Sequence, residues 1–232
     1  MRKIAALITT ILLGLPTVSV AQNSPVVVEL FTSQGCSSCP PADAYLTTLA
    51  DREDVVALAL HVDYWDYIGW KDKFADPPYT KRQKAYAQAA GHRSIYTPQI
   101  IVNGKEHVVG NHPKDVAQLI STHNDAAAVV DLSISKDGQT LAIAATASQE
   151  IKGPIAVQLV RYEPSQSVKI RSGENAGKEI TYSNIVTEWH HIANWNSRKP
   201  LQMVTEVTGD QPVVVILQRK GPGQIVATAR LR

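Results

Sequence analysis

Two cysteines three positions apart, Cys36 and Cys39, constrain this 232-residue chain more than any other feature of its sequence. They are its only cysteines, and they follow an apolar run, Val26–Phe31, that is typical of a buried strand. Two thiols at this spacing can form one disulfide or bind one metal ion. A disulfide here would close a very short loop, which adds little stability, so a purely structural cross-link is a poor explanation. Structural zinc needs four ligands, and the sequence has no second Cys-x-x-Cys pair.

The first residues predict export. Arg2 and Lys3 precede an apolar stretch over residues 4–15, and Ser19-Val20-Ala21 supplies small residues where a signal peptidase cleaves. We therefore expect residues 1–21 to be a signal peptide and the protein to be periplasmic or secreted, with no stable membrane span after cleavage. The chain has 23 basic and 21 acidic side chains, and two of the basic ones lie in this leader. The near-neutral remainder does not suggest nucleic acid as a partner.

Residues 22–126 are expected to form a first domain that alternates strands and helices. Asn103-Gly104 predicts a tight β-hairpin turn, and the prolines at positions 40 and 41 belong near the first turn of a helix. The predicted elements are strands over 25–31, 55–61, 96–102 (entered through a proline) and 105–109, and helices over 42–50, 80–90 and 113–124. The first strand, helix and second strand read as a parallel βαβ unit.

This order of elements resembles the thioredoxin fold. Two separate signals carry the resemblance: a Cys-x-x-Cys pair after the first strand and a Thr97-Pro98 pair before the third. The resemblance implies that Pro98 is cis and shields the sulfurs, and that Thr97 offers backbone groups to an incoming peptide. It implies that Cys36 is the exposed thiol that attacks and that Cys39 resolves. It also suggests proton exchange between Glu29 and Cys39, although Glu29 is one residue farther from the cysteines than the thioredoxin pattern has it.

Four segments narrow the resemblance to one family. The segments 28–43, 61–66, 96–99 and 171–177 are similar to motifs of the bacterial exported proteins grouped as domain-of-unknown-function family 1223. The likeness covers nearly the whole chain after the leader. It implies a thioredoxin-like domain, and the family supplies no established substrate.

Residues 127–232 change in character and predict a mainly antiparallel, sandwich-like β domain. Apolar and polar residues alternate in short runs that are separated by turn signals. The predicted strands cover residues 129–135, 141–147, 155–162, 201–207, 213–219 and 224–231. Residues 179–195 are ambiguous, because Ile185 and Trp189 have helical spacing whereas Ile180, Tyr182 and Thr187 favour a strand.

Three functions fit these signals. The first is an exported thiol–disulfide oxidoreductase without a cofactor, whose partners are protein thiols or disulfides. A helix N-terminus lowers the pKa of a thiol that lies on it, but Pro40-Pro41 suggests a helix that begins nearer Cys39 than Cys36. That arrangement would leave Cys36 less activated than the first cysteine of thioredoxins.

The second function is a copper-binding or copper-delivery module that uses Cys36 and Cys39, with His61 or His92 as a further ligand. Cu(I) accepts few, soft ligands, so two thiolates and one imidazole would suit it. The third is a non-catalytic interaction protein, because a fold does not by itself establish an activity. The sequence leaves all three open.

Overall fold

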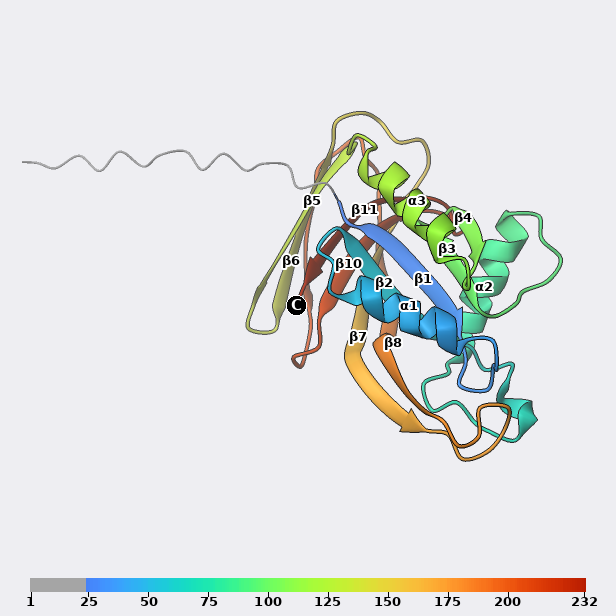
Figure 1. Cartoon of the computed structure of the whole chain (residues 1–232). Coiled ribbons are helices and arrows are strands. Elements are labelled where there is room, and N and C mark those ends of the chain that lie inside the picture. Colours follow the sequence, from blue (N-terminus) through green and yellow to red (C-terminus); the bar gives the residue numbers. More distant parts are fainter. Residues whose placement is uncertain (1–23) are drawn as a thin grey trace, which may run out of the picture.

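The computed structural model describes residues 24–232, so the predicted signal peptide lies outside the described residues. An eight-stranded mixed sheet forms the centre of the protein, in the order β11-β10-β7-β8-β2-β1-β3-β4. A second sheet of three antiparallel strands, in the order β5-β6-β9, lies beside it (Figure 1). Among residues 24–232, no helix is both long and apolar enough to cross a membrane.

The elements of the first half follow the predicted order. They are β1 (Val26–Thr32), α1 (Pro40–Ala50), β2 (Val55–His61), the short 3-10 helix η1 (Asp66–Ile68), α2 (Pro77–Ala89), β3 (Gln99–Val102), β4 (Glu106–Val109) and α3 (Pro113–Asn124). β1 and β2 are parallel, and β3 pairs antiparallel with both β1 and β4. The parallel pairing brings the carboxyl ends of β1 and β2 to one edge of the sheet.

The second half contributes strands to both sheets. They are β5 (Val130–Asp137), β6 (Thr140–Ala147), β7 (Ile155–Lys169), β8 (Glu179–Trp195), β9 (Leu201–Glu206), β10 (Val213–Arg219) and β11 (Ile225–Leu231). The ambiguous segment 179–195 is one long strand, because it pairs along its length with β7. Its apolar residues have helical spacing because two register shifts in the pairing with β7 interrupt the alternation of its side chains.

The sheet crosses the predicted domain boundary at residues 126 and 127. β8 pairs in parallel with β2 through Ala59 and Ile185, and β7, β10 and β11 continue the sheet from there. Only β5, β6 and β9 form the separate antiparallel sheet. The structure thus differs from an α/β domain followed by an independent sandwich, because valine-rich strands from both halves are buried side by side.

Alternating side chains of the central sheet build a core on each face. On one face, apolar residues of β1 and β2 pack against α1 and α3, and the three-stranded sheet covers the β7, β10 and β11 end of the same face. On the other face, Phe31 and Leu58 pack with Tyr79 and Tyr86 of α2. α1 and α2 therefore lie on opposite sides of β1 (Figure 1).

The β7–β8 hairpin extends beyond the part of β7 that pairs with β10, and it bends away from the sheet. Register shifts interrupt the pairing near Arg161 and Tyr162, and Asn184 on the opposite strand has a φ of 49°, in the left-handed region. Past this bend the hairpin runs beside α1, where the hydroxyl oxygens of Thr47 and Ser183 lie 3.0 Å apart. Its tip reaches the end of β1 that carries the cysteines (Figure 1).

Candidate functional site

The Cys36–Cys39 disulfide lies in the connection between β1 and α1. The two cysteines are bonded, and both residues are fully buried, so the expectation that Cys36 is exposed is wrong. α1 begins at Pro40 with Cys39 as its N-cap, and the N–H groups of Ala42 and Asp43 donate to the Cys39 carbonyl. Cys39, rather than Cys36, therefore lies at the helix N-terminus, as the two prolines suggested.

Cys36 precedes the helix and has a different neighbour. Its Sγ lies 3.4 Å from the hydroxyl oxygen of Ser38, and its carbonyl accepts a hydrogen bond from the Cys39 N–H. A hydroxyl at this position can donate to a thiolate and so favour the ionised form of Cys36. The local hydroxyl thus compensates in part for the greater distance of Cys36 from the helix end.

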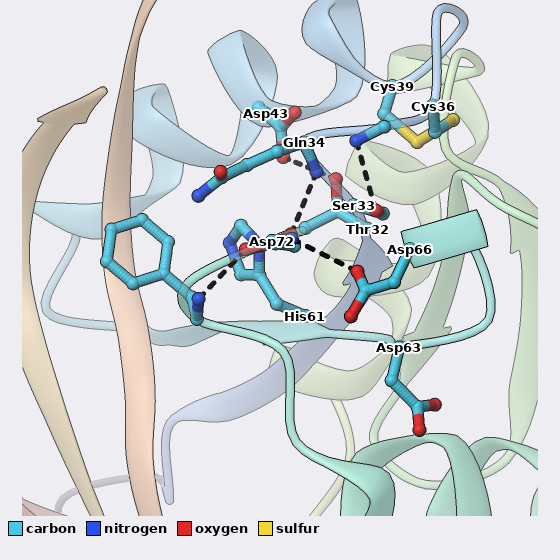
Figure 2. A network of polar contacts seen from close by, with 12 residues as sticks. Thr32, Ser33, Gln34, Cys36, Cys39, Asp43, His61, Asp63, Asp66 and Asp72 are labelled. Carbon is cyan, nitrogen blue, oxygen red and sulfur yellow. Dashed lines mark hydrogen bonds and ion pairs between the residues drawn. A yellow bond between two sulfur atoms is a disulfide. The ribbon is translucent and has the colours of Figure 1, made fainter. Parts of the chain in front are cut away.

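A network of buried polar side chains lies near the disulfide, at the carboxyl ends of β1 and β2 (Figure 2). His61 Nδ1 is 2.7 Å from Asp72 Oδ2, and neither side chain is exposed. The same carboxylate oxygen accepts the backbone N–H of Gln34 at 2.8 Å, two residues before Cys36. We call residues 33–39, which connect β1 to α1, the cysteine loop. Asp72 thus links the end of β2, the cysteine loop and the segment after β2 in one hydrogen-bond network.

The environment of Asp72 keeps it ionised. Burial on its own would raise the pKa of this carboxyl, but the charge and hydrogen bond of His61 and the N–H groups of Gln34 and Phe74 together hold the pKa below its usual range. Asp72 is therefore the anion of the network, and it fixes the orientation of the His61 ring.

Asp43 is the opposite case. It lies on the buried side of α1, and its Oδ1 accepts a hydrogen bond from the Thr32 hydroxyl at 2.8 Å. Burial raises the pKa of Asp43 to about 7, while the nearby His61 and the Thr32 hydroxyl lower it and Asp72 raises it further. Among residues 24–232, Asp43 Oδ2 and His61 Nε2 are buried without a hydrogen-bond partner. One buried carboxyl in the first turn of the helix that follows Cys39 thus has a pKa near neutral pH.

The segment between β2 and α2 packs against the cysteine loop. Trp70 Nε1 donates to the side-chain carbonyl of Gln34 at 2.8 Å, and a Cβ on Gly35 would lie 3.1 Å from Ile68 Cδ1. Trp65 Nε1 donates to the Thr97 hydroxyl at 2.7 Å. The aromatic segment therefore links the two motifs that the sequence placed at the site.

Thr97 and Pro98 lie at the entry to β3, and their peptide bond is cis. Pro98 is buried, and its carbonyl accepts the N–H of Gly110. A Cβ on Gly110 would come within 2.8 Å of Pro98 Cβ and 2.9 Å of Ala42 Cβ. The proline and the first turn of α1 therefore meet the same glycine, which places Pro98 on the side of the sheet that carries the cysteines.

Glu29 lies on the other face of the sheet, which is a correction to the role that the resemblance suggested for it. It alternates with Val28 and Leu30, whose side chains face α1, and so points toward α2. There its carboxylate forms a bidentate pair with Arg82 at 2.6 and 2.9 Å and accepts the Tyr86 hydroxyl. A carboxylate held in this way has the contacts of a structural ion pair, and the strand separates it from Cys39.

The two candidate copper ligands have other partners. His61 is buried and directs Nδ1 at Asp72, whereas His92 is exposed, with its ring centroid 5.2 Å from that of His107. Within the described part of the chain, no group of three or more His, Cys, Asp or Glu side chains is arranged to hold a metal ion. The geometry therefore does not assemble the four proposed ligands around one point, and copper binding stays a prediction.

Sequence reasoning missed three residues of the site. Asp43 and Asn175 fall inside motifs that the sequence analysis singled out, but nothing local shows that Asp43 is buried beside Thr32 or that the Asn175 amide donates to the Gln34 and Cys36 carbonyls. Asp72 lies 38 residues from its backbone partner Gln34, in a segment without regular structure. The usable signal was the isolated Asp43 among the apolar residues of α1, since a charged side chain on a buried helix face needs a reason.

One family model and two solved structures match this chain. The model of the family described as "Protein of unknown function (DUF1223)" matches residues 27–218. A crystal structure of protein AGR_C_4864 from Agrobacterium tumefaciens is 32% identical, with a TM-score of 0.78, over 91% of this chain and 96% of that chain. HBP35 of Porphyromonas gingivalis is 14% identical, with a TM-score of 0.60, over 90% of this chain and 75% of that chain, and this likeness concerns the fold alone.

A search of the curated proteins finds no match. The family match covers most of the chain, and the Agrobacterium protein is similar over nearly its whole length. The chain therefore belongs to the DUF1223 family of proteins of unknown function.

Proposed function

We propose that this protein is an exported thiol–disulfide oxidoreductase that works through the Cys36–Cys39 pair on a thioredoxin-like half. The observation that carries the proposal is the disulfide itself, placed at the N-terminus of α1 with a protonatable carboxyl, Asp43, one turn along the same helix. The order of elements over residues 26–124 and the cis Thr97–Pro98 bond agree with such a half.

The reaction follows from this placement. A thiolate of a partner dithiol attacks Cys36 Sγ, the Cys36–Cys39 bond breaks, and its electron pair goes to Cys39 Sγ. Cys39 then takes a proton, and we assign the donor to Asp43, whose backbone N–H donates to the Cys39 carbonyl and whose pKa is raised to about 7. The second thiolate of the partner attacks the mixed disulfide, Cys36 leaves as a thiolate, and the partner is oxidised. Run in reverse, the same steps reduce a partner disulfide.

Each cysteine has a separate stabilising contact in this scheme. The Ser38 hydroxyl lies beside Cys36 Sγ, and the end of α1 lies at Cys39. A helix N-terminus and a hydroxyl donor both favour a thiolate. Each contact therefore stabilises the thiolate form of its own cysteine in the reduced pair.

The test is a redox titration of the purified protein in buffers of reduced and oxidised glutathione, with the thiols trapped by alkylation. A reversible two-electron transition in the wild type that disappears in Cys36→Ser and Cys39→Ser is the expected result. A pair that stays oxidised in the most reducing folded samples would contradict the proposal.

A non-catalytic role on the same scaffold is the second candidate. Full burial of both cysteines favours it, because a disulfide that no partner thiol reaches does not cycle. In that case partner binding would survive replacement of both cysteines by serine, and the titration would show no transition in the native state.

Export is part of the proposal. It rests on the N-terminal sequence, with its basic start, its apolar core and Ser19-Val20-Ala21. A mature protein that begins at Gln22 in the periplasmic or culture fraction is the expected finding. An intact N-terminus in the cytoplasmic fraction would contradict it.

A further inference from the structure

The tip of the β7–β8 hairpin covers the cysteine loop. We name residues 170–178, which connect β7 to β8, the cover loop. The side-chain amide of Asn175 donates to two carbonyls of the cysteine loop, those of Gln34 and Cys36, at 2.9 Å each. The carboxylate of Glu174 accepts the Ser37 N–H at 3.2 Å. Side chains of the cover loop, about 140 residues away in the sequence, thus form hydrogen bonds with three backbone groups around Cys36.

Neighbouring contacts hold the cover loop in place. The Ser172 hydroxyl donates to the Gly69 carbonyl at 2.6 Å, and a Cβ on Gly173 would lie 3.2 Å from Trp70 Cβ. Lys178 Nζ donates to the side-chain oxygen of Asn175 at 2.8 Å, which fixes the amide with its NH₂ group toward the two carbonyls. Asn175 is buried, whereas Glu174 and most of the cover loop are exposed.

This cover has a direct consequence for the proposed chemistry. An attacking thiolate must approach Cys36 Sγ, yet Cys36 is fully buried in the closed arrangement. The residues around it that are exposed, Ser37 and Ser38, present their own backbone and hydroxyl groups rather than sulfur. Access therefore requires a displacement of the cysteine loop or of the segment that holds it.

We propose that Asn175 is a positioning residue that holds the cysteine loop closed, so that opening of the cover loop sets how fast a thiol reaches Cys36. The inference rests on the proposed redox function and deepens it, because it assigns a part in that function to the second half of the chain. Asn175 contacts carbonyls and not sulfur, so it acts through the position of Cys36 and takes no part in bond exchange.

The test compares rates of disulfide reduction by dithiothreitol at pH 7, followed by acid quenching and alkylation. Asn175→Ala removes two buried hydrogen bonds from the closed state, and we expect reduction to become about tenfold faster or more. Reoxidation by oxidised glutathione is expected to become faster as well, which leaves the midpoint potential nearly unchanged. Acceleration in both directions at an unchanged potential distinguishes a change in access to Cys36 from a change in the relative stability of the two redox states.

Ser197→Ala is the matched control for loss of stability. Ser197 is buried in the connection between β8 and β9, where its hydroxyl accepts the Ile151 N–H at 2.8 Å and donates to the Ile151 carbonyl at 3.3 Å. The variant therefore also removes two buried hydrogen bonds, at the end of β8 opposite the cover loop. The melting temperatures of both variants are measured alongside the rates. Equal rates in Asn175→Ala and the wild type would overturn the inference, and so would an equal acceleration in Ser197→Ala at equal loss of stability.

A second pair of variants tests another contact between the cover loop and the cysteine loop, at the exposed residue Glu174, where a substitution does not endanger folding. Glu174→Gln keeps a carbonyl oxygen that can accept the Ser37 N–H, whereas Glu174→Ala does not, and both remove the same charge. We expect faster reduction of Glu174→Ala than of Glu174→Gln, and equal rates would count against the cover. The two proposals fail in different ways. If the disulfide is not reduced in the folded state of any variant, the redox function is contradicted. If the disulfide is reduced at the same rate in all variants, only the role of the cover loop is contradicted.

Discussion

The imidazole of His61 and the carboxylate of Asp72 are joined at 2.7 Å in a place where neither is exposed to solvent. His61 ends β2, and Asp72 lies in the segment that returns toward α2. The pair reaches the cysteine loop because Asp72 also accepts the Gln34 N–H. It thus connects the sheet edge to the disulfide, and its removal is expected to affect both stability and the cysteine loop.

Asp72→Asn breaks this buried pair and should be strongly destabilising, by about 3–5 kcal/mol in the free energy of unfolding. The pKa of Asp72 is held low in the folded protein, so its contribution is present above the ordinary carboxyl pKa and is lost as the pH falls through its folded value. Urea denaturation at pH 7 and at lower pH measures both effects.

The matched control for this pair is Asp115→Asn, which removes an exposed carboxylate 3.3 Å from His112 on the first turn of α3. Exposed pairs contribute about 1 kcal/mol or less. A cost for Asp72→Asn as small as that of the control would show that the buried pair does not support the fold.

Asp43 predicts a pH dependence of the opposite sign. Its pKa is raised from 3.8 to about 7 in the folded protein, so the folded state holds a proton that the unfolded state releases between these values. Stability from this group is therefore fully present below pH 3.8 and is lost as the pH rises to about 7, by up to about 4 kcal/mol.

Asp43→Asn replaces the titrating carboxyl by a neutral amide of similar shape. The fall in stability between about pH 4 and pH 7 should become smaller in this variant than in the wild type, as measured by urea denaturation across that range. Identical pH profiles for the two proteins would mean that Asp43 does not carry the buried proton.

Asp43 and Glu29, whose carboxyls lie on opposite sides of the sheet, should affect the kinetics of disulfide reduction differently. Asp43→Asn is expected to change the pH dependence of disulfide reduction near pH 7, because Asp43 lies on the cysteine side of the sheet. Glu29→Gln is expected to lower stability through the loss of its pair with Arg82 while leaving that pH dependence unchanged. The reverse outcome would restore the role that the resemblance to thioredoxins gave to Glu29.

Gly110 is predicted to tolerate no side chain. A Cβ there would come within 2.8 Å of Pro98 and 2.9 Å of Ala42, and neither neighbour is the end of a flexible side chain. Gly110→Ala should therefore cost about 1–3 kcal/mol through overpacking and should shift Pro98 relative to α1. Denaturation measures the first effect, and an altered rate of disulfide reduction reports the second. An unchanged stability would contradict the close packing of these three residues.

The local structure of the first half could be predicted from the sequence because it depends on short-range signals. Strand β2 and helix α3 have the predicted bounds, Val55–His61 and Pro113–Asn124, and α3 begins at a proline, which suits the first helical positions. Helix α1 begins two residues earlier than predicted, at Pro40, because proline is well accommodated at the first helical positions.

The long-range arrangement could not be predicted in the same way. Nothing in the local pattern of residues 179–195 shows that β8 pairs with β2, because that pairing joins segments more than 100 residues apart through a single pair, Ala59 and Ile185. The same holds for Asn175, whose partners are the backbone carbonyls of Gln34 and Cys36 and so leave no trace in side-chain types. The orientation of Glu29 also depended on which helix covers which face of the sheet.

Covalent trapping of a partner protein shows whether Cys36 exchanges disulfides, as we propose. Without Cys39, a mixed disulfide on Cys36 cannot resolve within the protein, so Cys39→Ser expressed with its leader should accumulate covalent partner adducts that a reductant releases. Cys36→Ser should accumulate far fewer, although it also keeps one cysteine. Abundant, reductant-sensitive adducts of Cys39→Ser are the predicted result, whereas equal adducts from both variants, or none from either, would contradict the account.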